Sequence, residues 1–132
     1  MHMLLKSLAR NESTIVNNKK ILNDIEEIES SEQRLESRTT ISDYLDILKR
    51  LYVIDYQEAY SVNYRSPERI GKTSKRHFTD PSLACAILEL NESKLINDLN
   101  TFGFMFESLV ERDLKIYMDY LNGHLYHFRD NI

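Results

Sequence analysis

The chain is short of the residues that hold small extracellular domains together, and it has no long hydrophobic run. Among 132 residues there is one cysteine, Cys85, so no disulfide can form within the chain. One cysteine and four histidines also do not supply the closely spaced ligands of a structural zinc site. No apolar stretch approaches the roughly 20 residues that cross a bilayer, and no signal-peptide pattern begins the sequence. These absences predict a cytoplasmic protein without a membrane segment, with Cys85 as a small core residue.

Positive charge is also scarce. Lys and Arg number 17 against 21 Asp and Glu, which gives a formal net charge of −4. An acidic balance argues against a protein dedicated to nucleic-acid binding. The exception is the segment 62–79, where five basic residues stand against Glu68 alone: Arg65, Arg69, Lys72, Lys75 and Arg76. We interpret this segment as a DNA-contacting surface, although a solvated loop tip or a surface for an acidic protein explains it equally well.

Helical periodicity dominates the first third of the chain. Three segments with apolar residues at helical spacing are predicted to be helices: 2–10, 17–28 and 40–51. Thr40 and Asp43 resemble a capping box at the start of the third. Residues 51–60 then change to β-branched and aromatic types, which predicts a strand, and 75–79 are its expected return strand.

The second half is again predicted to be helical. Asp80 before Pro81 is typical of a helix start, and that helix should run to about Leu90. A short helix to about Leu99, a long helix over 101–121 and a strand over 124–130 are expected to follow. The fold class is therefore mainly α with a small β hairpin (α+β). The element order predicts a winged helix-turn-helix domain over 1–80, then a helical extension and a terminal strand over 81–132.

The start of the third helix offers hydroxyl and guanidinium groups for DNA phosphates. We predict contacts from four residues there: Arg38, Thr39, Thr40 and Ser42. The alternative is that the threonines only cap the helix and that Arg38 is solvated. Asp43 and Asp46 would lie on the same exposed face of this helix. Two acidic side chains there are a poor match to the phosphate backbone, which argues against readout of the DNA bases by this helix.

The predicted helix over 101–121 has the clearest amphipathic pattern in the chain. Seven apolar residues at three- and four-residue spacing form a stripe: Phe102, Phe106, Leu109, Val110, Leu114, Tyr117 and Leu121. Gly123 stands where a left-handed residue would end the helix. Glu107 lies beside the stripe, and we expect it to reach water or to pair with Arg112 or Lys115.

Two weaker patterns do not predict sites. Gly71-Lys72-Thr73 resembles the end of a phosphate-binding loop, but Ser66 stands where that motif requires its first glycine. His124 and His127 would point to opposite faces of a strand, so they are expected to be surface or partner-covered residues rather than metal ligands.

Five ordered blocks of sequence resemble one protein family. They are Ser7-Leu-Ala-Arg-Asn11, the run from Thr40 to Leu48, the run from Ser74 to Ala84, the run from Gly103 to Leu114, and Tyr126-His-Phe-Arg-Asp130. The family is the uncharacterised domain that follows the P-loop module in prokaryotic AAA-type ATP-binding proteins. Its members place a winged-helix segment before a core similar to the PD-(D/E)XK nucleases.

The resemblance has implications for the site and for the length of the chain. It puts Glu107 at the position of a helix Glu that helps to hold Mg²⁺ in the nuclease core. The other ligands would follow Ile132, and the ATPase module would precede Met1, so ATP and Mg²⁺ are expected only for those other modules. With no cofactor, catalytic residue or metal site expected here, the resemblance implies a non-catalytic fragment in which Glu107 is a vestigial ligand.

The resulting hypothesis is a winged-helix module that binds double-stranded DNA or protein and is not an enzyme. One alternative is an oligomerisation or protein-interaction domain without DNA binding, and another is an incomplete part of a metal-dependent nuclease. Because an apolar stripe is rarely left to water, we expect either a homo-oligomer through helix 101–121 or a helix that folds back onto the winged-helix part.

Overall fold

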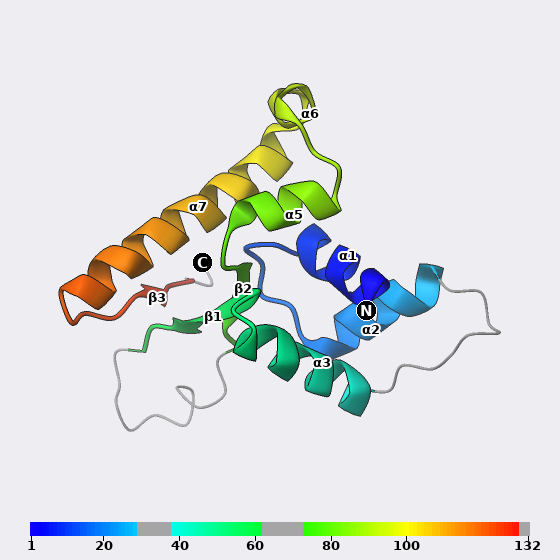
Figure 1. The fold of residues 1–132 in the computed structure, drawn as a ribbon, viewed down its shortest axis with the longest axis horizontal. Coiled ribbons are helices and arrows are strands. Elements are labelled where there is room, and N and C mark those ends of the chain that lie inside the picture. The colour runs from blue at the N-terminus through cyan, green and yellow to red at the C-terminus, as the bar shows by residue number, and fades with distance from the viewer. Residues whose placement is uncertain (29–37, 62–72, 130–132) are drawn as a thin grey trace.

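The computed structural model describes residues 1–28, 38–61 and 73–129 (Figure 1). Helices dominate this part of the chain, and three short strands form one mixed sheet. The elements are α1 (His2–Arg10), α2 (Asn18–Ile28), α3 (Arg38–Arg50), β1 (Ile54–Ala59), β2 (Lys75–Phe78), α5 (Pro81–Ile87), α6 (Glu92–Asn97), α7 (Leu99–Tyr120) and β3 (Tyr126–His127). The predicted α+β fold class and its order of three helices, hairpin, helical extension and terminal strand are confirmed.

The hydrophobic core lies between the first three helices and the hairpin. α1 packs against α2, α2 packs against α3, and α5 lies against α1 (Figure 1). Each helix contributes the apolar residues of its inner face, and Leu4, Ile21 and Ile41 are wholly buried. Ile54 and Phe78 close this core from the sheet. Burial of one such side chain stabilises the fold by roughly 1.5–3 kcal/mol, so these few residues hold the module together.

A buried polar contact fixes the angle between α1 and α2. The carboxylate of Asp24 accepts hydrogen bonds from the Ser7 hydroxyl at 3.0 Å and from the Asn11 amide at 2.8 Å. Arg10 approaches the same carboxylate at 3.4 Å. Since a buried carboxylate is costly unless it is paired, this cluster specifies one register between the two helices.

The sheet has the order β2-β1-β3, with β1 and β2 antiparallel and β1 and β3 parallel. Ile54 pairs with Phe78, and Asp55 pairs with His77. Neighbouring residues of a strand point to opposite faces, yet His77 and Phe78 are both buried. The sheet is therefore covered on both sides: Phe78 meets the helical core, and His77 meets the loop after α1 and the side of α7.

The helix starts in the second half follow the expected chemistry. The Asp80 carboxylate accepts a hydrogen bond from the Ser82 N–H at 2.8 Å, with Pro81 in the first turn of α5. Hydrogen bonds from the Ser82 hydroxyl and from this N–H lower the pKa of Asp80. Asn91 caps α6 in the same way, and Asp98 caps α7.

Several predicted boundaries are wrong by a few residues. α3 begins at Arg38, so Thr40 lies inside the helix and does not cap it as the predicted capping box required. The strands β1 and β3 are shorter than expected, and α5 ends at Ile87 because Glu89 takes a left-handed conformation. No helix in the described ranges combines the length and hydropathy that a membrane crossing requires.

The end of α7 differs from the prediction in its chemistry. Asn122, with φ of 54°, is the left-handed residue, and Gly123 does not have a positive φ. The Gly123 N–H donates to the Met118 carbonyl at 2.8 Å, which closes the helix. A Cβ at position 123 would lie 3.0 Å from the Met118 sulfur. A larger residue at 123 would need the Met118 side chain to shift, and Asn122 supplies the unusual backbone conformation.

Candidate functional site

The predicted DNA-contacting residues of α3 lie on its outer side only in part. Thr39 and Ser42 are exposed, while Thr40 is half-buried. Asp43 and Asp46 are also exposed, as expected, and Asp46 forms an ion pair with Arg50 at 3.7 Å. The outer side of α3 therefore mixes hydroxyls with both signs of charge.

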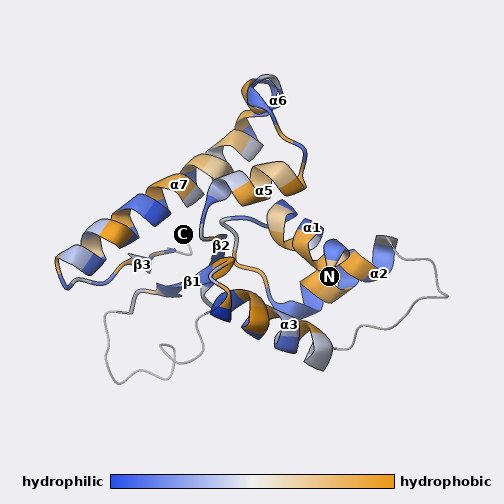
Figure 2. Cartoon of the chain, in the orientation of Figure 1, coloured by the Kyte–Doolittle hydropathy of each residue, from blue (hydrophilic) through white to orange (hydrophobic). Residues whose placement is uncertain are grey.

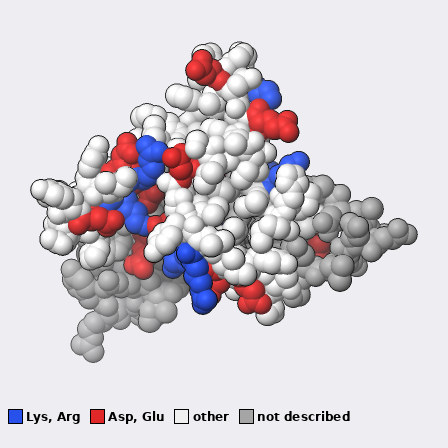
Figure 3. All heavy atoms as spheres, viewed as in Figure 1, with Lys and Arg blue, Asp and Glu red and all other residues white. Residues whose placement is uncertain are grey.

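The predicted basic segment largely makes contacts within the chain where the structure describes it. Arg65, Arg69 and Lys72 lie outside the described residues, as do Gly71 of the loop-like motif and most of its surroundings. Lys75 donates to the carboxylate of Glu107. Arg76 donates to the Asn18 side chain at 3.3 Å and lies 5.3 Å from the centre of the Tyr56 ring. On the face shown in Figure 3, acidic and basic side chains intermingle and form no single basic patch.

Glu107 has a different partner from the predicted one. Its carboxylate pairs with Lys75 of β2, whereas Arg112 pairs with Asp80 and Asp113, and Lys115 pairs with Asp55. Across the described ranges, no group of three or more His, Cys, Asp or Glu side chains has the geometry to hold a metal ion. The described residues around Glu107 therefore do not fit a Mg²⁺ site.

The side of α7 that faces the sheet is polar. Its buried residues are Met105, Ser108 and Glu111. Two ion pairs, from Glu107 to Lys75 and from Lys115 to Asp55, tie this side to β2 and β1. The apolar stripe predicted from the sequence does not meet this sheet. α7 does fold back onto α5 and the hairpin, but with the side opposite the stripe.

A buried network centred on His77 connects the loop after α1 to the sheet and to α7. Nδ1 of His77 lies 3.2 Å from a carboxylate oxygen of Glu12 and 3.3 Å from the Ser13 hydroxyl. The second oxygen of Glu12 accepts the Phe78 N–H at 2.9 Å. The Ser13 hydroxyl donates to the Phe104 carbonyl of α7 at 2.8 Å. Glu12, Ser13 and His77 are each at most 2% exposed, so this network is part of the core.

His127 lies at the edge of the same polar layer. Its Nε2 is 3.2 Å from the Thr73 carbonyl, and its Nδ1 is buried without a hydrogen-bond partner among the described residues. Burial lowers the pKa of His127. His124 is exposed, so the prediction that both histidines are surface residues holds for His124 and is wrong for His127.

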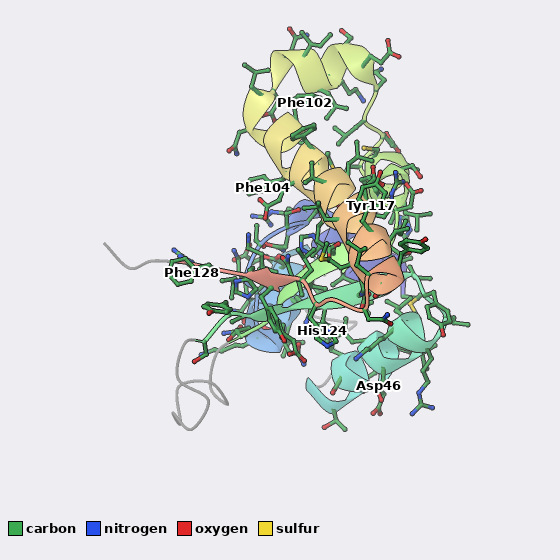
Figure 4. All side chains as sticks on the ribbon, turned by 90° about the vertical axis from the view of Figure 1, so that its left-hand side faces the viewer. Asp46, Phe102, Phe104, Tyr117, His124 and Phe128 are labelled. Atoms are coloured by element: carbon green, nitrogen blue, oxygen red, sulfur yellow. The ribbon has the colours of Figure 1, made fainter. Side chains whose placement is uncertain are left out.

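The opposite side of α7 is an apolar surface that the described residues leave open. We call it the apolar face of α7, and its members are Phe102, Phe106, Val110, Leu114, Tyr117 and Leu121, all exposed. Figure 2 shows hydrophobic and hydrophilic residues alternating along this helix, as two unlike sides require. Figure 4 shows the side chains of α7, with Phe102 near the beginning of the helix and Tyr117 in its later turns. The Phe102 and Phe106 rings stack, with centres 6.3 Å apart.

A cleft of about 370 Å³ opens on the polar side of α7, near its C-terminal end. β1, α7 and the segment from Gly123 to Tyr126 line it. Its ionisable residues are Glu58, Glu111, Lys115, Asp119 and His124. Burial raises the pKa of Glu111 and lowers the pKa of Lys115.

Sequence reasoning did not identify most of these polar residues. Glu12 and Ser13 follow α1, between the predicted helices 2–10 and 17–28, and Glu111 is one helical turn after Glu107. A polar residue every third or fourth position along 104–115, opposite the apolar stripe, was the available signal. It shows that the helix has a second defined side, but it does not show which side meets the sheet.

Comparisons with known proteins identify a family and no function. No curated protein and no solved structure matches the chain. The model of a family described as a domain of unknown function (DUF8612) matches residues 1–94, which include α1–α3, the hairpin and α5. α7 and β3 lie beyond the match. Because the match extends over most of its length, the chain belongs to the DUF8612 family.

Proposed function

We propose that this chain is a non-catalytic interaction module that forms a dimer through the apolar face of α7. The observation that supports this most directly is the row of six exposed apolar residues along a single helix. Single exposed apolar residues are ordinary, whereas a contiguous row marks a surface that another molecule covers. The helical module formed by α1–α3 and α5 then serves as the platform that presents α7.

The occupant that fits this face best is α7 of a second copy, in the antiparallel orientation. The apolar residues are spaced almost symmetrically about the middle of the helix. In an antiparallel pair Phe102 would lie opposite Leu121, Phe106 opposite Tyr117, and Val110 close to Leu114 of the other copy. Such an arrangement is isologous, because each contact occurs twice about the two-fold axis.

Charge on this face is no obstacle to such a pair. Asp113 is the one charged residue that helical spacing puts among the apolar ones along α7. Its carboxylate already accepts a hydrogen bond from its neighbour Arg112 at 3.0 Å, and Arg112 also contacts Asp80 at 3.1 Å. In the dimer, the Arg112–Asp113 pairs of the two copies would face each other near the two-fold axis. Arg112 of one copy would then be close to Asp113 of the other.

The area is sufficient for a specific but modest interface. A helix of 22 residues is about 33 Å long. Aromatic and large aliphatic side chains of this kind, each about half exposed, would bury roughly 600 Å² per copy, or about 1,200 Å² in total. This is the lower end of the range for stable complexes, so we expect a dimer with micromolar affinity.

Sedimentation equilibrium of the wild-type chain tests this proposal. We expect the apparent mass to rise from that of one chain towards that of two between micromolar and millimolar concentrations. A chain that remains a monomer throughout this range, with α7 intact by circular dichroism, would overturn the proposal.

DNA binding is the second candidate function, because Thr39 and Ser42 are exposed in the first turns of α3. The clean variant replaces Arg65, Arg69 and Lys72 with Gln, since Lys75 and Arg76 have structural partners. Binding to duplex DNA at low salt should weaken in this variant, with the salt slope reduced by about 0.9 for each phosphate that the variant no longer neutralises. Absence of any wild-type gel shift at low salt would reject DNA binding, and with Mg²⁺ present the duplex should stay uncut.

A place beside an ATPase module, and a nuclease-like origin for α7, are proposals that rest on the sequence resemblance alone. In this context Glu107 acts as a structural acceptor for Lys75. The incomplete-nuclease alternative lacks support in the described residues, because the carboxylate that it needs for a metal is already paired.

A further inference from the structure

The cleft beneath α7 contains a carboxyl group, that of Glu111, which has no partner among the described residues. Glu111 is 8% exposed and lines the cleft. It forms no hydrogen bond or ion pair with any described residue, and the nearest charged groups that act on it are His77 and Glu12. His77 attracts the Glu111 carboxylate, and the carboxylate of Glu12 repels it. The carboxylate oxygens of Glu111 are not among the fully enclosed polar atoms without a partner, so they face the cleft, where a cation can reach them.

The surroundings of Glu111 add negative charge. Glu58 and Asp119 line the same cleft, and both are exposed at its opening. Lys115 is the basic residue of the lining, but Asp55 already pairs with its ammonium group. With that pair neutral, the cleft carries three carboxyl groups and only His124 as a further ionisable side chain. The carboxyl groups of the lining outnumber its one ammonium group, so the cleft attracts cations.

The geometry favours an organic cation over a metal ion. The carboxyl groups do not converge, since no described group of three acidic, His or Cys side chains can hold a metal. A metal ion needs its oxygen ligands within about 2.0–2.6 Å, whereas an alkylammonium ion can bridge more widely separated carboxylates. The cleft of about 370 Å³ is within the usual size of small-molecule sites.

We propose that this cleft binds a small alkyl diamine or triamine, with one primary ammonium group on the carboxylate of Glu111. The second ammonium group lies at the opening between Glu58 and Asp119. The methylene chain passes Met118 and Tyr126, which both line the cleft. The site lies on the side of α7 opposite the apolar face, so it does not depend on dimer formation.

Titration calorimetry with putrescine and with spermidine tests the site, together with amide NMR spectra of the full chain. We expect saturable binding of both amines, with shifts confined to β1, the last turns of α7 and residues 123–126. Glu111→Gln keeps the shape of the side chain and removes its charge, and it should weaken binding at least tenfold. Glu58→Gln, at the exposed opening, should weaken binding about threefold.

Glu92→Gln is the matched control, because Glu92 is an exposed carboxylate on α6 away from the cleft. It should bind both amines as the wild type does. Equal affinity of the wild type and Glu111→Gln would overturn the proposal, as would failure of both amines to saturate at millimolar concentration. Saturation of the same amides by Mg²⁺ with equal strength would also overturn it, since it would show only unspecific attraction of cations. If Glu111→Gln does not fold, Glu58→Gln still tests the proposal. Amine affinity of Glu58→Gln equal to that of the wild type would overturn it, because the second ammonium group would then make no contact with Glu58.

Discussion

Phe106→Asp should convert the dimer to a monomer at concentrations where the wild-type chain is fully associated. Phe106 is 55% exposed and lies near the middle of the apolar face of α7, opposite Tyr117 of the second copy. The dimer contains this contact twice, so each copy would bring an unpaired charge into an apolar interface. Removal of a central aromatic side chain costs at least about 2 kcal/mol, and two such changes weaken association by more than about 100-fold. Sedimentation equilibrium measures this change directly.

The control is Ile47→Asp, which introduces the same charge at an apolar residue of similar exposure, 46%, on α3. It should leave the dimer unchanged. The antiparallel register has its own test: Tyr117→Lys added to Phe106→Asp would put opposite charges against each other across the interface and should restore part of the affinity. A dimer that survives Phe106→Asp and dissociates with Ile47→Asp would assign the interface to α3 instead.

Glu12→Ala should cause the largest loss of stability of any single charged-to-alanine change in the described network. The carboxylate of Glu12 satisfies both the Phe78 N–H and His77 Nδ1, and all three groups are buried. Its removal leaves the buried Phe78 N–H without a partner and His77 Nδ1 with only the Ser13 hydroxyl, at a cost of about 3 kcal/mol in the free energy of unfolding. Urea unfolding followed by circular dichroism measures this at one fixed protein concentration, since dimer formation couples to stability.

Glu26→Ala is the matched control for this change, because Glu26 is an exposed residue of the neighbouring helix α2. Its free energy of unfolding should stay within about 0.5 kcal/mol of the wild type. Glu12→Gln keeps one acceptor for the Phe78 N–H and should lose about half as much as Glu12→Ala. A loss below about 1 kcal/mol for Glu12→Ala would show that water replaces the carboxylate, and that the network is not a structural requirement.

The helices of this fold could be predicted from the sequence because each one has a single apolar side. α1 and α2 end where the periodicity ends, and Asp80 with Pro81 marks the start of α5 through local chemistry alone. The turn at Asn122 could not be assigned, because Asn and Gly both adopt left-handed conformations and the choice depends on the space beside Met118.

The candidate site was less predictable than the fold, because it depends on which side of α7 meets the sheet. Hydrophobicity favours burial of the stripe that contains Phe106. The structure instead buries Ser108 and Glu111, since the facing side of the sheet carries Asp55 and Lys75, which have charged partners on α7. Strand residues reveal their partners only after the strands pair. The spacing of apolar residues in the sequence could therefore identify the two sides of α7, but not which of them meets the sheet.

The polar attachment of α7 divides the molecule into two levels of stability. α1–α3, α5 and the hairpin supply nearly all of the apolar core, to which α7 adds only Met105 among its fully buried residues, and two partly exposed ion pairs hold α7 to the sheet. Added salt screens such pairs and hardly affects apolar burial. α7 is therefore the unit that opens first by sub-global unfolding, before the remainder of the fold melts. When it opens, Glu107, Ser108 and Glu111 become accessible together, so salt concentration controls whether this side of the helix is closed against the sheet or available to solvent.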